Sequence, residues 1–229
     1  MNHKHFKEIS STQSFIRKYK DLDDKDLLVS CDKQNSGHGQ YSRTWDQYEG
    51  GLCFSFTLMP CEILTLSSLE IGILICHYFQ SKYDTKLKLK WPNDIMTETG
   101  NKCGGIIINN AINSKNIIVG VGLNLLPSNF DQSYKTTAGH ILSSSTNLNN
   151  QTLSLDIYNY ILNNRILSNQ ITHIWTKLCV HMNQPLTIKD EDSHSGIFKG
   201  VGKVGEAQIL INNSVESFYT GSLTLKENS

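Results

Sequence analysis

The segment from residue 87 to residue 124 places strand-like runs in quick succession. LKLKWPND alternates in polarity, so that Leu87, Leu89 and Trp91 share one face, and the lysines between them share the other. Pro92 then removes a backbone donor and ends the hydrogen-bonding ladder. The residues ETGN are typical of a tight hairpin turn and lead into the apolar runs KCGGIIIN and NIIVGVGLN. A chain with this segment is expected to build its fold around a β-sheet.

Other periodic segments precede this one. SSTQSFIRKY offers hydroxyl N-caps and predicts a helix that begins near Ser11. DLLVSCDKQ and the alternating GLCFSFTL predict two strands joined by a polar loop, and residues 64–83 predict a helix with a buried face. We therefore expect an α+β fold in which helices flank a mixed β-sheet.

The second half of the chain begins with a polar stretch, residues 126–152, for which we expect surface loops and a short helix. A helical pattern then runs to Val180, with Ser154 as its expected N-cap and a break near Ser168.

Beyond Asn183 the pattern changes to short alternating runs separated by Gly and Asn turns, as in a small all-β unit. A unit this small is expected to rest on the larger domain. The predicted domains are residues 1–183 and 184–229.

Composition restricts the partners and the compartment. Lys plus Arg and Asp plus Glu both number 21, so the 229-residue chain has no net charge that would attract nucleic acid or an anionic membrane. The N-terminal residues lack the apolar core of a signal peptide, and no apolar run is long enough to span a bilayer, so we expect a cytoplasmic protein. The six cysteines show no CxxC pairing and are expected to be buried, reduced thiols.

The predicted loop DKQNSGHGQYSRTW alternates glycines with polar residues. Gly37 and Gly39 would let backbone N–H groups approach a ligand closely, and Arg43 could hold a phosphate through its planar guanidinium. The residues alone favour the plainer alternatives, namely a simple turn, a solvated arginine and a surface His38.

KWPND combines a cation, an aromatic ring, an amide and a carboxylate at the end of a strand, where binding sites commonly lie. If the next strands pair through the ETGN turn, Lys102 lies close to Asp94. GVGLN ends an apolar strand with two glycines and an amide, which could shape a pocket for a flat base. The alternatives are an ordinary turn, a solvated lysine and tight strand packing.

Taken together and in chain order, these segments resemble the biotin-protein ligase family. The resemblance rests on SSTQS, on Q-x-x-G-x-G-x-x-x-R-x-W as QNSGHGQYSRTW, on KWPND, on K-x-x-G-I as KCGGI, and on GVGLN. KWPND followed by K-x-x-G-I is highly specific. The resemblance implies a class II synthetase-like catalytic domain of the biotin-lipoate ligase fold, followed by a small SH3-like β barrel.

The resemblance also implies a reaction. Such an enzyme joins biotin to ATP, giving biotinyl-5'-AMP and pyrophosphate, and passes biotin to a lysine in a biotin-acceptor domain of a biotin carboxyl-carrier protein or carboxylase. Mg²⁺ would accompany ATP, and the sequence does not identify its ligands. By resemblance, biotin contacts fall to Ser11, Thr12, Gln13, Gln34, Gly37, His38, Gly39, Gln40, Lys102 and Gly105, nucleotide contacts to Arg43, Trp45, Asn93 and Asn124, and catalysis to Lys102, Arg43 and Asp94.

The implied chemistry suits these residue types. Attack of a carboxylate on a phosphate brings anions together, so fixed cations such as Arg43 and Lys102 are needed where charge accumulates. The acceptor amine, with a pKa of about 10.4, is mostly protonated at neutral pH. Asp94 is hypothesised to orient that amine or to accept its proton.

The chain departs from the family at the glycine-rich loop, which commonly reads GRGRxGRxW. Here His38 and Gln40 stand at two cationic positions and Ser42 at a glycine. We expect weaker retention of the adenylate as a result. A glutamate that often follows the K-x-x-G-I strand is Asn109 here, and no effect is assigned to it.

Two rival functions stay open, namely a lipoate or octanoyl transferase of the same fold and a biotin-binding module without catalysis. Few residues precede Ser11, so we expect no N-terminal DNA-binding domain and no nucleic-acid partner. The sequence leaves open whether the chain forms a homodimer.

Overall fold

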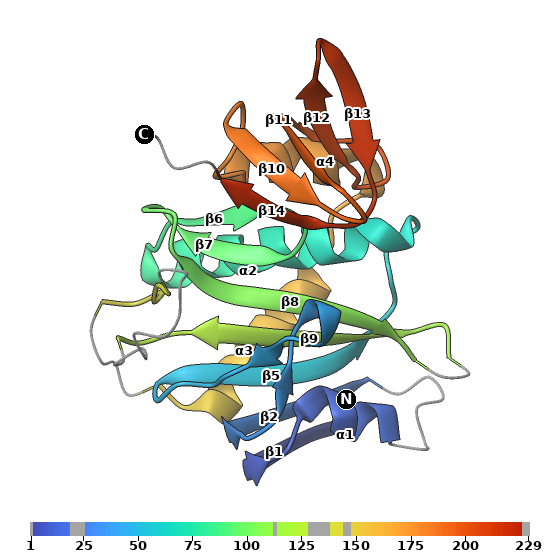
Figure 1. The fold of residues 1–229 in the computed structure, drawn as a ribbon. Coiled ribbons are helices and arrows are strands. Elements are labelled where there is room, and N and C mark those ends of the chain that lie inside the picture. Colours follow the sequence, from blue (N-terminus) through green and yellow to red (C-terminus); the bar gives the residue numbers. More distant parts are fainter. Residues whose placement is uncertain (1, 19–25, 112–113, 128–137, 144–147, 226–229) are drawn as a thin grey trace.

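A seven-stranded mixed sheet forms the centre of the larger unit in the computed structural model, which describes residues 2–18, 26–111, 114–127, 138–143 and 148–225 (Figure 1). The strand order is β1-β2-β5-β9-β8-β7-β6. β1 and β2 run parallel, whereas all other neighbours in this sheet are antiparallel. The strands are β1 (Asn2–Ile9), β2 (Leu27–Gln34), β5 (Gly51–Leu58), β6 (Leu87–Lys90), β7 (Asp94–Thr97), β8 (Lys102–Asn110) and β9 (Ile117–Asn124).

Helices cover both faces of the sheet, which is why the central strands β5 and β9 are buried along their whole length. On one face, α1 (Thr12–Lys18) packs Ile16 against Val29 and Ile118. On the other face lie α2 (Ser67–Tyr83), preceded by the 3-10 turn η2 (Leu64–Leu66), and α3 (Asn150–Asn163). The expected α+β fold with a mixed sheet is confirmed.

Two details of the larger unit differ from expectation. β1 was not predicted, because NHKHFKEI mixes charged and apolar residues without a clear alternation. α3 begins at Asn150, where the Asn149 side chain accepts a hydrogen bond from Thr152 N at 2.9 Å, so the expected N-cap at Ser154 is wrong. Ser154 lies inside the helix, and its hydroxyl donates to Gln151 O.

The helical pattern does break where expected, since α4 (Ser168–Leu178) begins after a short connection. The short helix expected between residues 126 and 152 is absent from residues 126–127, 138–143 and 148–149, and the rest of that stretch before α3 lies outside the described residues. None of the described helices is long and apolar enough to cross a membrane.

The C-terminal unit is a five-stranded antiparallel sheet of order β13-β12-β11-β10-β14, which confirms the expected small β unit. Its strands are β10 (Pro185–Lys189), β11 (Ser193–Val201), β12 (Ala207–Ile211), β13 (Ser214–Phe218) and β14 (Ser222–Leu225). It lies against the β6–β7 hairpin and α2 (Figure 1). The Trp91 indole donates to Gly205 O at 2.9 Å, and one apolar core runs through both units. The boundary at residue 183 stays a prediction.

Candidate active site

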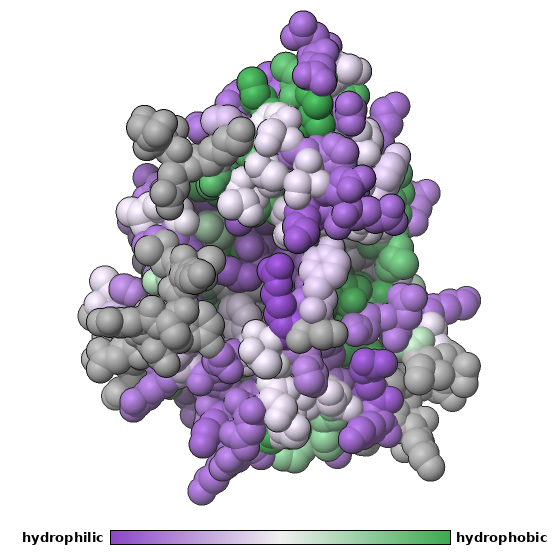
Figure 2. Space-filling view, in the orientation of Figure 1, coloured by the Kyte–Doolittle hydropathy of each residue, from purple (hydrophilic) through white to green (hydrophobic). Residues whose placement is uncertain are grey.

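A cavity opens where the end of β2, the loop after it, the β6–β7 hairpin, strands β8 and β9, and the start of β14 meet. The face that carries the loop is mainly hydrophilic and hollowed near its middle (Figure 2). The sequence-predicted residues that line the cavity are Ser11, Thr12, Gln13, Gln34, His38, Gly39, Gln40, Arg43, Trp45, Asn93, Asp94, Lys102 and Gly105. The fold therefore brings together segments that are far apart in the sequence.

The recess of the cavity, defined as Ser11, Thr12, Gln13 and Gln34, is neutral and closely hydrogen-bonded. Thr12 N and Thr12 Oγ1 both approach Gln34 Oε1, at 2.9 and 3.2 Å, and Thr12 Oγ1 is 2.8 Å from Ser55 Oγ. The first three residues are almost fully buried. These polar groups are therefore held in place by the fold without any ligand.

Gln13 has a different role from its neighbours in the recess. Its side-chain amide donates long hydrogen bonds to Ile107 O and Ile118 O, at 3.3 and 3.4 Å, and these bonds connect α1 to strands β8 and β9. Gln13 also lines the cavity, so a bound ligand could contact it as well.

The rim loop, Gly37–Trp45, is a small hairpin formed by β3 (Gly37–His38) and β4 (Thr44–Trp45). A side chain at Gly37 would collide with the backbone oxygen of Trp45, its partner across the hairpin, so glycine is required there for β3 and β4 to pair. Gly37 itself is buried and lies behind the cavity wall rather than on it.

Trp45 lies flat on the sheet inside the cavity. A Cβ atom at Gly122 would be 2.5 Å from Trp45 Nε1, and one at Gly105 would be 3.3 Å from Trp45 Cζ3. In this structure the flat ring over Gly122 and Gly105 is the Trp45 indole of the chain itself, and not the flat base expected at GVGLN. Lys102 Nζ lies 5.7 Å from the centre of that ring.

The predicted proximity of Lys102 to Asp94, across β7 and β8, is confirmed, and the two side chains form an ion pair. Lys102 Nζ is 2.5 Å from Asp94 Oδ1, and the two side chains are 38% and 18% exposed. The Asn93 side chain donates to Ile106 O at 2.6 Å and fixes the KWPND turn to β8. The short hairpin therefore places a lysine and a carboxylate together at the cavity wall.

Lys90 is a further cation in the cavity that sequence reasoning assigned to the polar face of a strand. Its pKa is lowered mainly by burial, and Lys102 and Arg43 lower it further, whereas Asp94 raises it. Arg43 is exposed at the rim. Three cations and a single carboxylate, Asp94, line the cavity among the described residues, so this part of the neutral chain attracts anions.

Other lining residues were also missed, namely Tyr41 and Gly221–Leu223 of the C-terminal unit. KWPND could have indicated Lys90, but no sequence signal links the C-terminal strands to the site. Asn124, expected near the nucleotide, does not line the cavity, and its side chain donates to Gly139 O at 3.2 Å.

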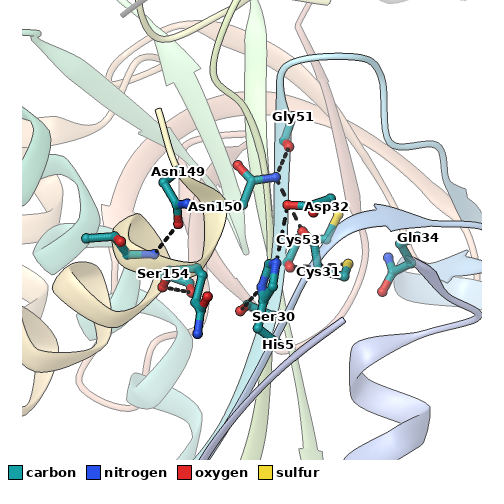
Figure 3. A network of polar contacts seen from close by, with 12 residues as sticks. His5, Ser30, Cys31, Asp32, Gln34, Gly51, Cys53, Asn149, Asn150 and Ser154 are labelled. Atoms are coloured by element: carbon teal, nitrogen blue, oxygen red, sulfur yellow. Dashed lines mark hydrogen bonds and ion pairs between the residues drawn. The ribbon is translucent and has the colours of Figure 1, made fainter. Parts of the chain in front are cut away.

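A second polar cluster has the composition of a hydrolase triad (Figure 3). His5 lies between Ser30 Oγ, 2.9 Å from its Nδ1, and Asp32 Oδ1, 3.3 Å from its Nε2. His3 contacts the same hydroxyl at 2.9 Å. Because Ser30 is completely buried, it is inaccessible to a substrate, and the cluster ties β1 to β2 rather than carrying out chemistry.

No described residues form a group of three or more His, Cys, Asp or Glu that could hold a metal ion. All six cysteines are free, and five of them are buried, as expected.

Comparison with known proteins gives a consistent picture. The family model described as "Biotin/lipoate A/B protein ligase family" matches residues 6–124. Two curated relatives come from Arabidopsis thaliana: biotin–protein ligase 2 is 28% identical over 138 residues, which is 56% of this chain and 40% of the relative. Biotin–protein ligase 1, chloroplastic, is 33% identical over 104 residues, or 41% and 28% of the two chains. The matched segments thus span less than half of either relative.

Solved structures share the fold over nearly the whole chain. The biotin protein ligase from Aquifex aeolicus in complex with biotin and ATP superposes with a TM-score of 0.83 at 22% identity, covering 99% of both chains. The Leishmania major enzyme in complex with biotinyl-5-AMP gives 0.63 at 18% identity, covering 95% of this chain and 98% of that one. With the family match across more than half of its residues, the chain belongs to the biotin/lipoate A/B protein ligase family.

Proposed function

We propose that this chain is an ATP-dependent biotin–protein ligase, which forms biotinyl-5'-AMP and transfers biotin to a lysine of a biotin-acceptor domain of a carboxylase or carrier protein. One observation carries this proposal: the neutral, hydrogen-bonding recess and a cationic centre, formed by Lys90 and Lys102 with Arg43 at the rim, line the same cavity. A substrate with an uncharged polar ring at one end and a carboxylate at the other fits this division.

The recess suits the ureido ring of biotin. That ring offers two N–H donors and one carbonyl acceptor, and the hydroxyls of Ser11 and Thr12 with the amide of Gln34 supply both kinds of partner. Because Thr12 is already bonded to Gln34, and Ser11 Oγ already accepts from Ser14 N, binding would require little reordering.

The cationic centre suits the first reaction step. When the biotin carboxylate attacks the α-phosphate, negative charge accumulates on the phosphate oxygens. Lys102 and Arg43 would stabilise it, each good donor contributing roughly 3 to 4 kcal/mol, and Lys90 adds to the same field. Asp94 holds Lys102 at the cavity wall through the 2.5 Å ion pair.

The second step needs a neutral amine, because a protonated lysine cannot attack the adenylate. Asp94 is the single carboxylate among the described lining residues, and it is proposed to orient the incoming amine or accept its proton. Mg²⁺ would neutralise phosphate charge when bound with ATP. With Asp94 as the one acidic side chain in the described lining, such an ion would be held mainly by phosphate oxygens and water.

The test is to incubate the protein with ATP, Mg²⁺, biotin and a biotin-acceptor domain and to follow the mass of the acceptor. A gain of one biotinyl group supports the proposal. Transfer of lipoate or octanoate but not biotin would favour the rival transferase, and biotin binding without adenylate formation would favour a non-catalytic module. In an Asp94→Asn variant, transfer from preformed adenylate at an unchanged rate would exclude the amine role of Asp94.

A further inference from the structure

The side chain of Tyr41 joins the rim loop to the C-terminal unit. Gly221 N, in the turn between β13 and β14, donates a hydrogen bond to the Tyr41 hydroxyl at 3.0 Å. Gly221 and the following Ser222 and Leu223 line the same cavity as the rim loop. The C-terminal unit therefore forms one wall of the candidate active site, and Tyr41 connects that wall to the loop opposite.

The backbone of Tyr41 is unusual. Its φ of 54° and ψ of 39° lie in the left-handed region, which bulky L residues rarely adopt. Hydrogen bonds from Gly39 N to Arg43 O, at 2.7 Å, and from Arg43 N to Gln40 O, at 3.1 Å, close the turn around it. The residue is 61% exposed, yet its hydroxyl reaches a residue far away in the sequence.

The remaining side chains at the tip of the loop are less restrained. His38, Gln40 and Arg43 make no side-chain hydrogen bond or ion pair with another residue in the described part of the chain. The hydroxyl of Tyr41 is thus the tether that reaches from the loop tip to another unit of the fold.

We propose that Tyr41 is a positioning residue, a latch that holds the rim loop closed against the C-terminal unit. Through this latch the loop keeps Gln40 and Arg43 beside the cationic centre. Its effect on catalysis rests on the proposed ligase function, because the group retained behind the loop would be the adenylate.

The first test does not depend on activity. Tyr41→Phe keeps the ring and removes the hydroxyl, and Tyr219→Phe is the matched control, since Tyr219 is 70% exposed in the same region of the C-terminal unit. Amide hydrogen exchange is measured by NMR without substrates. A typical net hydrogen-bond contribution predicts about five-fold faster exchange at Gly221, Gly39 and Arg43 in Tyr41→Phe and no change in the control. Unchanged exchange at these amides would overturn the latch.

The second test measures dissociation of biotinyl-5'-AMP from the same proteins. The latch predicts about five-fold faster release from Tyr41→Phe, and a fall of similar size in the rate of adenylate formation, because Arg43 is held less firmly beside the cavity. Faster exchange with unchanged release would overturn the positioning role. Faster exchange in a protein that forms no adenylate would support the latch and overturn the ligase function instead.

Discussion

The two halves of the cavity are built in opposite ways. In the recess, the buried Thr12 bonds to Gln34 and to the adjoining, fully buried Ser55, whereas His38 and Arg43 on the rim loop are exposed. The recess can be buried because it is neutral, and the rim keeps its charge because it is solvated. If the proposed function holds, the fold itself prepares the recess for an uncharged ring, whereas the anion is held by a solvated loop and by the lysines behind it.

Lys102, where the two halves meet, should give the largest effect. Lys102→Ala removes the cation paired with Asp94 and is expected to lower the rate of adenylate formation by about 10²- to 10³-fold. The rate is measured as biotin-dependent pyrophosphate release. Lys177→Ala, which removes an exposed lysine on α4, is the control. A Lys102→Ala rate close to that of the control would show that Lys102 does not promote adenylate formation.

Gly122→Ala would disturb the Trp45 indole, which lies in the cavity between the recess and the tip of the rim loop. The new Cβ would meet the Trp45 indole, so the ring must leave the sheet, at a cost of about 1 to 3 kcal/mol of unfolding free energy. We expect red-shifted Trp45 fluorescence and weaker biotin binding, measured by calorimetry.

A double variant supplies the check on this prediction. Adding Trp45→Ala to Gly122→Ala should recover most of the lost stability, because the clash disappears. Additive losses would show that Trp45 is not the residue displaced.

Thr12→Val tests the recess. It removes the hydroxyl shared by Gln34 and Ser55, and Ser55 is fully buried. We expect a loss of about 1 kcal/mol in unfolding free energy and about ten-fold weaker biotin binding, by urea denaturation and calorimetry. Thr12→Ser, which keeps the hydroxyl, should restore most of both. Equal behaviour of the valine and serine variants would contradict the prediction.

Gln40→Arg tests the rim and should have the smallest effect. A second cation on the loop is expected to slow adenylate dissociation several-fold, by roughly the 1 kcal/mol of an exposed charge contact, while leaving biotin affinity unchanged. Asn163→Arg, at an exposed position on α3, adds the same charge elsewhere. Equal dissociation rates in the two variants would mean that the small number of cations on the loop does not weaken retention of the adenylate.

Features encoded within a few residues were predictable from the sequence. The Asp94–Lys102 pair follows from two adjacent strands and a tight turn, and the mixed sheet follows from strand periodicity. Even locally, Asn149 and Ser154 are both acceptable N-caps, and propensity could not choose between them.

Long-range contacts were not predictable. β1 is half-exposed and pairs in parallel with β2, so its residues carry no strong alternation. The sequence around Tyr41 does not indicate Gly221 as its partner, and the sequence around Trp45 does not indicate that its ring packs on Gly122. Such contacts depend on how distant elements pack, which a single sequence does not display.

The apolar core shared by the two units has a consequence for how the molecule comes apart. Trp91 belongs to the same apolar core as Phe198 and Ile209. The C-terminal unit therefore cannot unfold alone and leave the larger unit, with its side of the cavity, intact. Heating is therefore expected to give one calorimetric transition instead of two. A ligand in the cavity would then raise the melting temperature of the whole chain, since both of its walls are lost in the same event.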